Sequence, residues 1–448
     1  MTRASWSSRV GFVLATAGFA IGLGNIWRFP YLAGTHGGGA FVIVYVLLAI
    51  LVGIPLMTAE ISMGRKAQAT PILGMRKLTG KKGSPWNAIS WLGLLAAFLI
   101  ESYYFLILGW AVAYAIRIGS GRFTGATTET VATSYTSFIG NTGETLLYAL
   151  GVMVLTGVVV SRGLRQGVEA AAKWLMPVLF VFLIVLAIGS LTLPGAAAGL
   201  AWYLKPDWSQ VTPGMALTAL GQVFFSIGIS MAAAFVYGSY VEPKGSDVPG
   251  GAATVVAFDT LAALIAGLVI FPAVFAFNLP PDSGPGLLFV TMANVFARAP
   301  LGAVAGAAFF VLVFVAGFTS VIAVLEALAS TVHETWGVSR QKAIWGMLAV
   351  LFVVGLPSAL SFGPWSDLTI AGKDFFSLID WIAVSICLPI GGLLIALYVA
   401  WVWGFDRFRS ETNEGADRIT VQAAWGPVMR YLIPVAVLLI VVTSLGLF

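Results

Sequence analysis

Long apolar runs separated by short polar stretches dominate the hydrophobic pattern of the chain. A helix needs about 17–25 apolar residues to cross the hydrocarbon core of a bilayer. Eleven runs of this kind can be placed, at residues 10–34, 40–63, 88–116, 144–161, 174–193, 214–236, 252–277, 301–331, 343–361, 376–403 and 427–447. The pattern predicts an all-α integral membrane protein with eleven transmembrane helices.

The composition favours the same class of protein. Of the 448 residues, 59% are hydrophobic and only 10% are charged. A soluble domain needs a larger polar exterior, so we expect the lipid bilayer to be the main solvent of this chain. The single cysteine, Cys387, lies in an apolar run, which argues against a disulfide framework or a cysteine metal cluster. The net charge of +5 comes without a basic tail, so no nucleic-acid partner is indicated.

Basic residues between the apolar runs predict the orientation, because Lys and Arg collect on the cytoplasmic side. With the N-terminus in the cytoplasm, eighteen Lys and Arg residues fall on the cytoplasmic side and five on the opposite side. The one remaining residue of the 24 Lys and Arg residues is Arg28, which lies inside the first run. An odd number of spans then places the C-terminus outside.

Two of the runs contain residues that interrupt a helix. The first holds GFAIGLGNIWRFPY (residues 18–31), with three glycines in seven positions, and the sixth holds GQVFFSIGISMAAA (residues 221–234). Irregular backbone at mid-membrane depth is tolerated only where it lines a protected cavity. Close helix packing at glycine is the alternative explanation. The breaks begin two successive groups of five spans, which favours an inverted-repeat transporter with its substrate site between the breaks.

This arrangement predicts three parts of the chain. Residues 1–200 are expected to form the first inverted repeat and residues 201–410 the second. Residues 411–448 are expected to form a loop and the eleventh helix.

The motif GFAIGLGNIWRFPY, with the following GGGAF (residues 37–41), closely resembles the signature of the neurotransmitter:sodium symporter family. The resemblance runs from Arg3 to the tenth span, and the eleven-span layout is most similar to bacterial amino-acid transporters of this family. It implies a sodium-coupled symporter, not an enzyme, that imports neutral, hydrophobic L-amino acids by alternating access with two Na⁺ ions. The implied location is the inner (cytoplasmic) membrane of a prokaryotic cell.

The resemblance also implies two sodium sites, for which hard oxygen ligands are suitable. The first would be formed by Ala20, Asn25, Ser226 and Asp259, and the second by Gly18, Ile21, Ala316, Thr319 and Ser320. Ala316, Thr319 and Ser320 stand at i, i+3 and i+4, so they share one helix face. The two hydroxyls could instead bond back to their own helical turn.

Asp259 stands where asparagine is commoner in the family. A carboxylate near the bilayer centre costs about 2.5–3.5 kcal/mol, which favours a functional role. A structural salt bridge is the alternative, but its span carries no nearby basic residue. Relatives that need chloride bind it at positions matching Tyr45, Gln222, Ser226 and Asp259, and chloride-independent relatives can carry an acid at the position of Ala263. We therefore predict that the charge of Asp259 makes chloride unnecessary.

The same matching implies a substrate site made of Phe19, Ala20, Gly22, Gly24, Ile100, Tyr104, Phe225, Ser226, Gly228, Met231, Ser320 and Val324. Gly22 stands where monoamine-transporting relatives carry aspartate, so a half-helix end can receive the substrate carboxylate. Tyr104 matches a tyrosine that donates to that carboxylate, with aromatic packing as the alternative. The apolar wall favours a hydrophobic side chain. Glu101 is unusual here, and it either bonds within the scaffold or admits a polar or cationic substrate.

Two further sets match the gates of the family. The outer pair would be Arg28 and Asp380, with Phe225 as an aromatic lid. The inner latch would be formed by Arg3, Trp6, Glu334, Ser239 and Tyr240. Anchoring at the membrane interface is the alternative role for Trp6.

Two other functions remain open on the sequence alone. One is a proton-coupled or exchange-only carrier in which Asp259 or Glu101 titrates. The other is a non-transporting receptor or an ion channel on the same scaffold. The sodium-site and gate positions argue against both, although a fold by itself does not decide a function.

Overall fold

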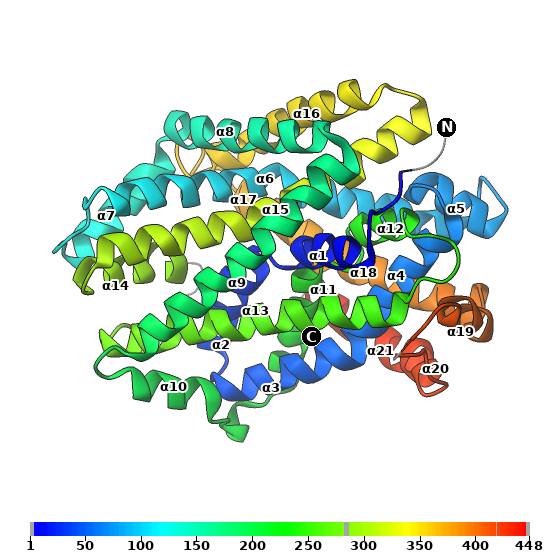
Figure 1. Cartoon of the computed structure of the whole chain (residues 1–448). Helices are drawn as coiled ribbons and strands as arrows, with labels where there is room; N and C mark the ends of the chain where they lie inside the picture. Colours follow the sequence, from blue (N-terminus) through cyan, green and yellow to red (C-terminus); the bar gives the residue numbers. More distant parts are fainter. Residues whose placement is uncertain (1–3, 282–285, 418, 445–448) are drawn as a thin grey trace.

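The computed structural model describes residues 4–281, 286–417 and 419–444. Throughout these ranges the regular elements are helices, and β-type pairing is limited to two isolated bridges. Figure 1 shows an elongated bundle with α1 (Arg9–Ala20) and α15 (Gly302–Trp336) in its interior. The all-α prediction is confirmed.

The helices correspond to the apolar runs one by one. In the described ranges, nine helices are long and apolar enough to cross a membrane. They are Gly39–Ala67 (α3 and α4), Pro85–Gly119 (with α6), Thr142–Ser161 (α8), Leu164–Leu191 (with α9), Val248–Ala276 (α13), Gly302–Trp336 (α15), Arg340–Leu360 (α16), Phe375–Val402 (α17 and α18) and Trp425–Thr443 (α20 and most of α21). A bent pair of helices makes a tenth span, and α11 (Pro213–Ile227) with α12 (Ala233–Ser239) matches the sixth predicted run.

The first span is broken where its glycines fall. Helix α1 ends at Ala20, and the backbone of Ile21 is extended, with φ −75° and ψ 107°. The chain resumes in the π-helical turn Gly24–Arg28 and continues as α2 (Phe29–Thr35), at an angle of 49° to α1. Pro30 lies in the first turn of α2, where its missing N–H is not needed.

The sixth span is broken more severely. Three residues between α11 and α12 have positive φ, namely Gly228 at 73°, Ser230 at 64° and Ala232 at 62°. Such a conformation costs an L-residue about 1–3 kcal/mol, so the surroundings must hold it in place. The Ser230 N–H donates to Oε2 of the buried Glu60 on α4 (Ile54–Ala67) at 2.9 Å. Both predicted discontinuities are therefore confirmed.

Short helices cover the two ends of the bundle. Helices α5 (Pro71–Thr79) and α19 (Phe405–Asn413) lie at the end where the N-terminal segment lies, and α7 (Thr128–Gly140), α10 (Ala196–Leu204) and α14 (Met292–Arg298) lie at the other end (Figure 1). Helix α15 packs along α6 (Ala88–Gly119), α9 (Ala170–Leu191) and α1. The proposed boundaries at residues 200 and 410 stay a prediction.

Candidate functional site

One cavity lies between the two helix breaks. It is lined by Phe19, Ala20, Gly22, Gly24, Ile100, Glu101, Tyr104, Phe225, Ser226, Gly228, Met231, Ser320 and Val324. All twelve residues that the sequence assigned to a substrate site are in this set, and Glu101 is the additional member. The free space in this cavity is small, about 30 Å³.

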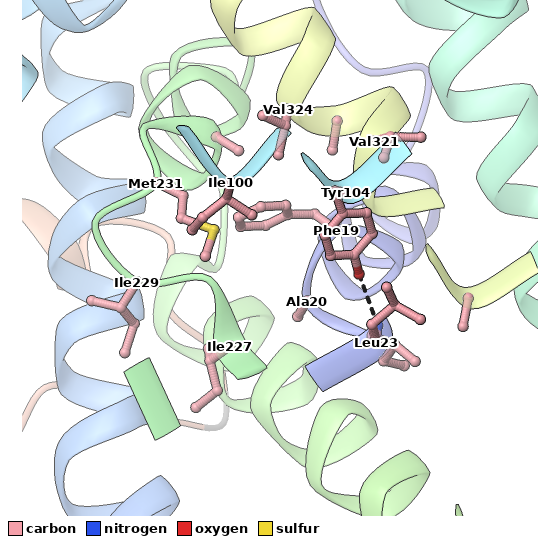
Figure 2. Close-up of a cluster of buried hydrophobic side chains, with 14 of the residues drawn as sticks. Phe19, Ala20, Leu23, Ile100, Tyr104, Ile227, Ile229, Met231, Val321 and Val324 are labelled. Carbon is pink, nitrogen blue, oxygen red and sulfur yellow. Dashed lines mark hydrogen bonds between the residues drawn. The ribbon is translucent and has the colours of Figure 1, made fainter. Parts of the chain in front are cut away.

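At one end of the cavity, the loosened backbone of the first span meets α6. The Leu23 N–H donates to the Tyr104 hydroxyl at 2.8 Å, a contact marked in Figure 2. A Cβ atom at Gly22 would lie 2.6 Å from both the Tyr104 hydroxyl and Ser320 Oγ. Close approach therefore favours glycine at position 22. An aspartate, as in the monoamine-transporting relatives, would not fit here without rearrangement.

The opposite wall is apolar. Figure 2 shows Phe19, Ile100, Met231 and Val324 gathered together, from α1, α6, the break in the sixth span and α15. A Cβ atom at Gly228 would overlap the Phe19 ring, and the φ of this glycine also disfavours any side chain. Such a wall suits an apolar group of a bound molecule, and the flexible thioether of Met231 lets the wall adapt to its shape.

A polar cluster lies beside the cavity, around the buried carboxylate of Asp259. The Asn25 amide donates to Asp259 Oδ1 at 2.7 Å and to Ser226 Oγ at 3.1 Å. Ser226 Oγ lies 3.1 Å from Asp259 Oδ1, and the Tyr45 hydroxyl donates to Oδ2 at 3.1 Å. Asn25 Oδ1 accepts from the Gly22 N–H at 2.9 Å. The cluster thus connects the first, second, sixth and seventh spans around one carboxyl group, and no salt bridge of Asp259 is present among the described residues.

A second group of oxygens surrounds the hydroxyl of Ser320. Its Oγ lies near the carbonyl oxygens of Phe19 at 3.0 Å, Gly18 and Ile21 at 3.4 Å, and Ala316 at 3.5 Å. The Thr319 hydroxyl donates to the Ala316 carbonyl at 2.8 Å, which is the bond within the helix that the sequence left as an alternative. The five residues predicted for the second ion are brought together between α1 and α15.

A second, larger space of about 320 Å³ adjoins the cavity at Tyr104 and Phe225. Arg28, Asp380 and Phe225 all line it. The two charged residues face the same space but do not form a direct ion pair. Asp380 instead accepts a hydrogen bond from the Tyr103 hydroxyl at 2.7 Å, and the Arg28 guanidinium lies 4.7 Å from the centre of the Phe225 ring. The structure therefore groups the predicted outer gate without pairing its charges.

At the other end of the bundle, Trp6 is packed against α12. Its indole N–H donates to the Tyr237 carbonyl at 3.0 Å, and its backbone N–H donates to the Tyr240 carbonyl at 3.4 Å. The Tyr240 hydroxyl donates to Glu326 at 2.9 Å, and Glu326 is also paired with Arg340 at 2.5 Å. Trp6 is thus buried in the bundle and is not an exposed interface anchor.

Of the three remaining members of the predicted latch, two are among the described residues. Arg3 lies outside the described residues. Glu334 accepts from the Thr70 N–H at 3.0 Å, and the Ser239 hydroxyl donates to the Val236 carbonyl at 2.5 Å.

Three supporting contacts were not predicted from the sequence. Glu60 holds Ser230 in the second break, Gln222 donates to the Gly24 carbonyl at 2.8 Å, and Tyr103 bonds to Asp380. Buried polar residues in apolar runs were the available signal, because each must find a partner inside the protein.

Comparisons with known proteins agree with this arrangement. Residues 3–124 and 128–448 match the Sodium:neurotransmitter symporter family. The chain is 36% identical over 443 residues to the uncharacterized sodium-dependent transporter YhdH of Bacillus subtilis, covering 99% of this chain and 98% of the relative. It is 26% identical to the creatine transporter of Torpedo marmorata, over 91% of this chain and 73% of the relative.

A solved structure extends the likeness to the fold. The crystal structure of MhsT in complex with L-phenylalanine is 39% identical in sequence, with a TM-score of 0.91 over 99% of this chain and 100% of that one. The resemblance that the sequence motifs indicated is thereby confirmed. The chain belongs to the Sodium:neurotransmitter symporter family and is a sodium-dependent, multi-pass membrane transporter.

Proposed function

We propose that the protein is a symporter that imports neutral, hydrophobic L-amino acids, coupled to two sodium ions and without a need for chloride. The observation that carries the proposal is the cavity between the two breaks, where unwound backbone, hydroxyls and an apolar wall meet, with the Asp259 carboxyl beside it. Unwound helix supplies carbonyl oxygens for a hard cation and N–H groups for a carboxylate in one place.

The first sodium ion is assigned to the cluster of Ala20, Asn25, Ser226 and Asp259. A cation suits this position because Asp259 is buried and makes no salt bridge among the described residues. The side-chain oxygens of Asn25, Ser226 and Asp259 and the carbonyl oxygen of Ala20 would hold the ion. The fixed charge of Asp259 then balances the ion and makes chloride unnecessary.

The second sodium ion is assigned to Gly18, Ile21, Ala316, Thr319 and Ser320. Support comes from the carbonyl oxygens of Gly18 and Phe19 in α1 and of Ile21 in the break, which converge on the Ser320 hydroxyl at 3.0–3.4 Å. Carbonyl and hydroxyl oxygens without a charged ligand suit a monovalent hard cation.

The substrate is assigned to the cavity with its carboxylate at the first break and its side chain against the apolar wall. The Tyr104 hydroxyl accepts a hydrogen bond from Leu23 and keeps its own hydrogen for an incoming carboxylate. The L-phenylalanine in the crystal structure of MhsT supports a hydrophobic amino acid as the cargo.

We assign alternating access to two layers of residues, one at each end of the bundle. We assign the end with Trp6 to the cytoplasm, because the basic residues of the connecting stretches lie on that side in the predicted orientation. There Trp6 and α12 form the closed inner layer, while Arg28, Asp380 and Phe225 line the outer space. Opening one layer while the other is closed would move the cargo inward across the inner membrane.

The test is uptake of labelled L-phenylalanine and L-leucine into proteoliposomes that contain the purified protein. We expect uptake when an inward sodium gradient is imposed in chloride-free buffer, and none with a potassium gradient. Uptake driven by a proton gradient without sodium would favour a proton-coupled carrier instead. If no amino acid is taken up under any gradient, the symporter proposal is wrong. Liposomes without protein serve as the control.

A further inference from the structure

The cavity contains one polar group that the symport scheme does not use. Glu101 lies on α6, lines the cavity and is only 1% exposed. Its Oε1 atom is buried without a hydrogen-bond partner among the described residues. A buried polar atom without a hydrogen-bond partner lowers the stability of the protein, which indicates a functional reason for its presence in the cavity wall.

Each of the other polar side chains of the cavity has a hydrogen-bond partner within the protein. Tyr104 bonds to the Leu23 N–H, Ser226 bonds to Asn25 and Asp259, and Ser320 bonds to carbonyl oxygens of α1. No basic side chain is among the lining residues. Glu101 is therefore the member of the cavity wall whose acceptor is left for a bound molecule.

The position of Glu101 along α6 indicates which part of the substrate it meets. Three residues of helix rise by about 4.5 Å, so Glu101 lies about one turn from Tyr104, where the substrate carboxylate is assigned. It is next to Ile100, a member of the apolar wall. The substrate's side chain, and not its α-carboxylate, is then the group within reach.

We propose that Glu101 determines specificity by accepting a hydrogen bond from a donor on the substrate's side chain. The inference rests on the proposed amino-acid transport. It narrows the proposed substrate class to amphipathic amino acids, whose side chain is apolar except for one N–H or O–H group. An indole N–H or a phenol O–H has this chemistry. A single acceptor in an apolar wall suits one neutral donor, and either protonation state of the carboxyl retains an oxygen that accepts.

The experiment measures displacement of labelled L-phenylalanine from the purified full-length protein in sodium buffer. Two matched pairs of competitors isolate the donor: tyrosine against phenylalanine, and tryptophan against 1-methyltryptophan, which lacks the indole N–H. The variants are Glu101→Leu, which removes the acceptor, and Glu101→Gln, which keeps an acceptor oxygen. Ser102→Ala is the matched control, because Ser102 is the next buried polar residue of α6, bonds to the Leu99 carbonyl and does not line the cavity.

We expect the wild type to prefer the donor-bearing member of at least one pair by about tenfold or more, since a site built for a donor rejects the analogue without it. Glu101→Leu should reduce that preference by about tenfold. Glu101→Gln and Ser102→Ala should retain the preference. Thermal unfolding of each variant checks that it is folded.

Three results would overturn the inference. They are a wild type that does not distinguish either pair, an unchanged preference in Glu101→Leu, and lysine as the strongest competitor of the wild type. The first and third need only the wild-type protein, so they hold even if a variant does not fold. If no amino acid binds in a sodium-dependent way, the proposed transport function fails as a whole. Sodium-dependent binding with equal ratios in wild type and Glu101→Leu refutes the role of Glu101 alone.

Discussion

The backbone N–H of Leu23 and the hydroxyl of Tyr104 lie 2.8 Å apart, which ties α6 to the break in the first span. The bond joins a free donor of unwound backbone to a side chain 81 residues away in the sequence. The tyrosine oxygen accepts this bond, and we assign the hydroxyl hydrogen to the substrate carboxylate. One residue thus holds the break and presents a donor to the carboxylate that we assign there.

Tyr104→Phe should weaken amino-acid binding because it removes both of these bonds and leaves the shape of the cavity nearly unchanged. A hydrogen bond to a charged group contributes about 1.5–3 kcal/mol, which corresponds to about 10- to 150-fold in affinity. Sodium-dependent binding of labelled phenylalanine measures the change. An affinity equal to that of the wild type would show that the substrate carboxylate lies elsewhere.

Gly22→Ala should also impair substrate binding, but by crowding. The added methyl group would lie 2.6 Å from Ser320 Oγ and from the Tyr104 hydroxyl. Such overpacking costs about 1–3 kcal/mol, or about 5- to 150-fold in affinity. Gly221→Ala is the control, because a Cβ atom at Gly221 meets nothing within 4 Å. Equal loss in both variants would point to a general effect of replacing glycine and not to the site.

Asp259→Asn should make uptake depend on chloride. The substitution removes the negative charge that we assign beside the first sodium ion, and loss of a buried charge partner costs about 2–5 kcal/mol. We expect uptake in chloride-free gluconate buffer to fall by about tenfold or more and to recover in part when chloride is added.

The double variant Asp259→Asn with Ala263→Glu provides a rescue for this prediction. It places an acid one helical turn later, where chloride-independent relatives carry it, and should restore uptake without chloride. Full activity of Asp259→Asn in chloride-free buffer would refute the proposed role of Asp259.

Thr319→Val should weaken the second sodium site with little change in volume. We expect the sodium concentration for half-maximal uptake to rise by about 2- to 12-fold, as for loss of one ordinary hydrogen-bonding oxygen. The Hill coefficient for sodium should fall from near two toward one. Thr331→Val is the matched control, because this buried threonine of α15 makes the same bond within its helix, to the Ala327 carbonyl at 2.7 Å. A common response of both variants would assign the effect to the helix and not to an ion.

The number of sodium ions transported with each substrate can be measured from the highest ratio of internal to external substrate that the vesicles reach. At 100 mV, each sodium ion releases about 2.3 kcal/mol, and a tenfold gradient adds about 1.4 kcal/mol per ion. Two ions supply about 7 kcal/mol, enough for about five decades of accumulation. One ion supplies about half of that. Accumulation that stays below three decades in tightly sealed vesicles, under both driving forces, would contradict coupling to two ions.

Features that depend on neighbouring residues could be predicted from the sequence. The apolar runs at 40–63 and 252–277 became the helices Gly39–Ala67 and Val248–Ala276, because a continuous apolar run has only one stable form in lipid. The glycines of GFAIGLGNIWRFPY and Gly228 marked the two breaks, because they permit backbone that other residues disfavour. The match to the family motif then predicted the twelve residues that share one cavity.

The tertiary structure alone decided which polar groups meet and which do not. Asn25 bonds to Asp259 across 234 positions, and Arg28 and Asp380 share a space without pairing directly. Such contacts depend on how the helices rotate and cross, to ångström accuracy. A residue pattern within one helix carries no information on the distance between that helix and another. The sequence by itself therefore determined where this chain spans the membrane and where its helices must break. Packing decided that the breaks face each other and that, among the described residues, the Oε1 atom of Glu101 is left without a partner beside them.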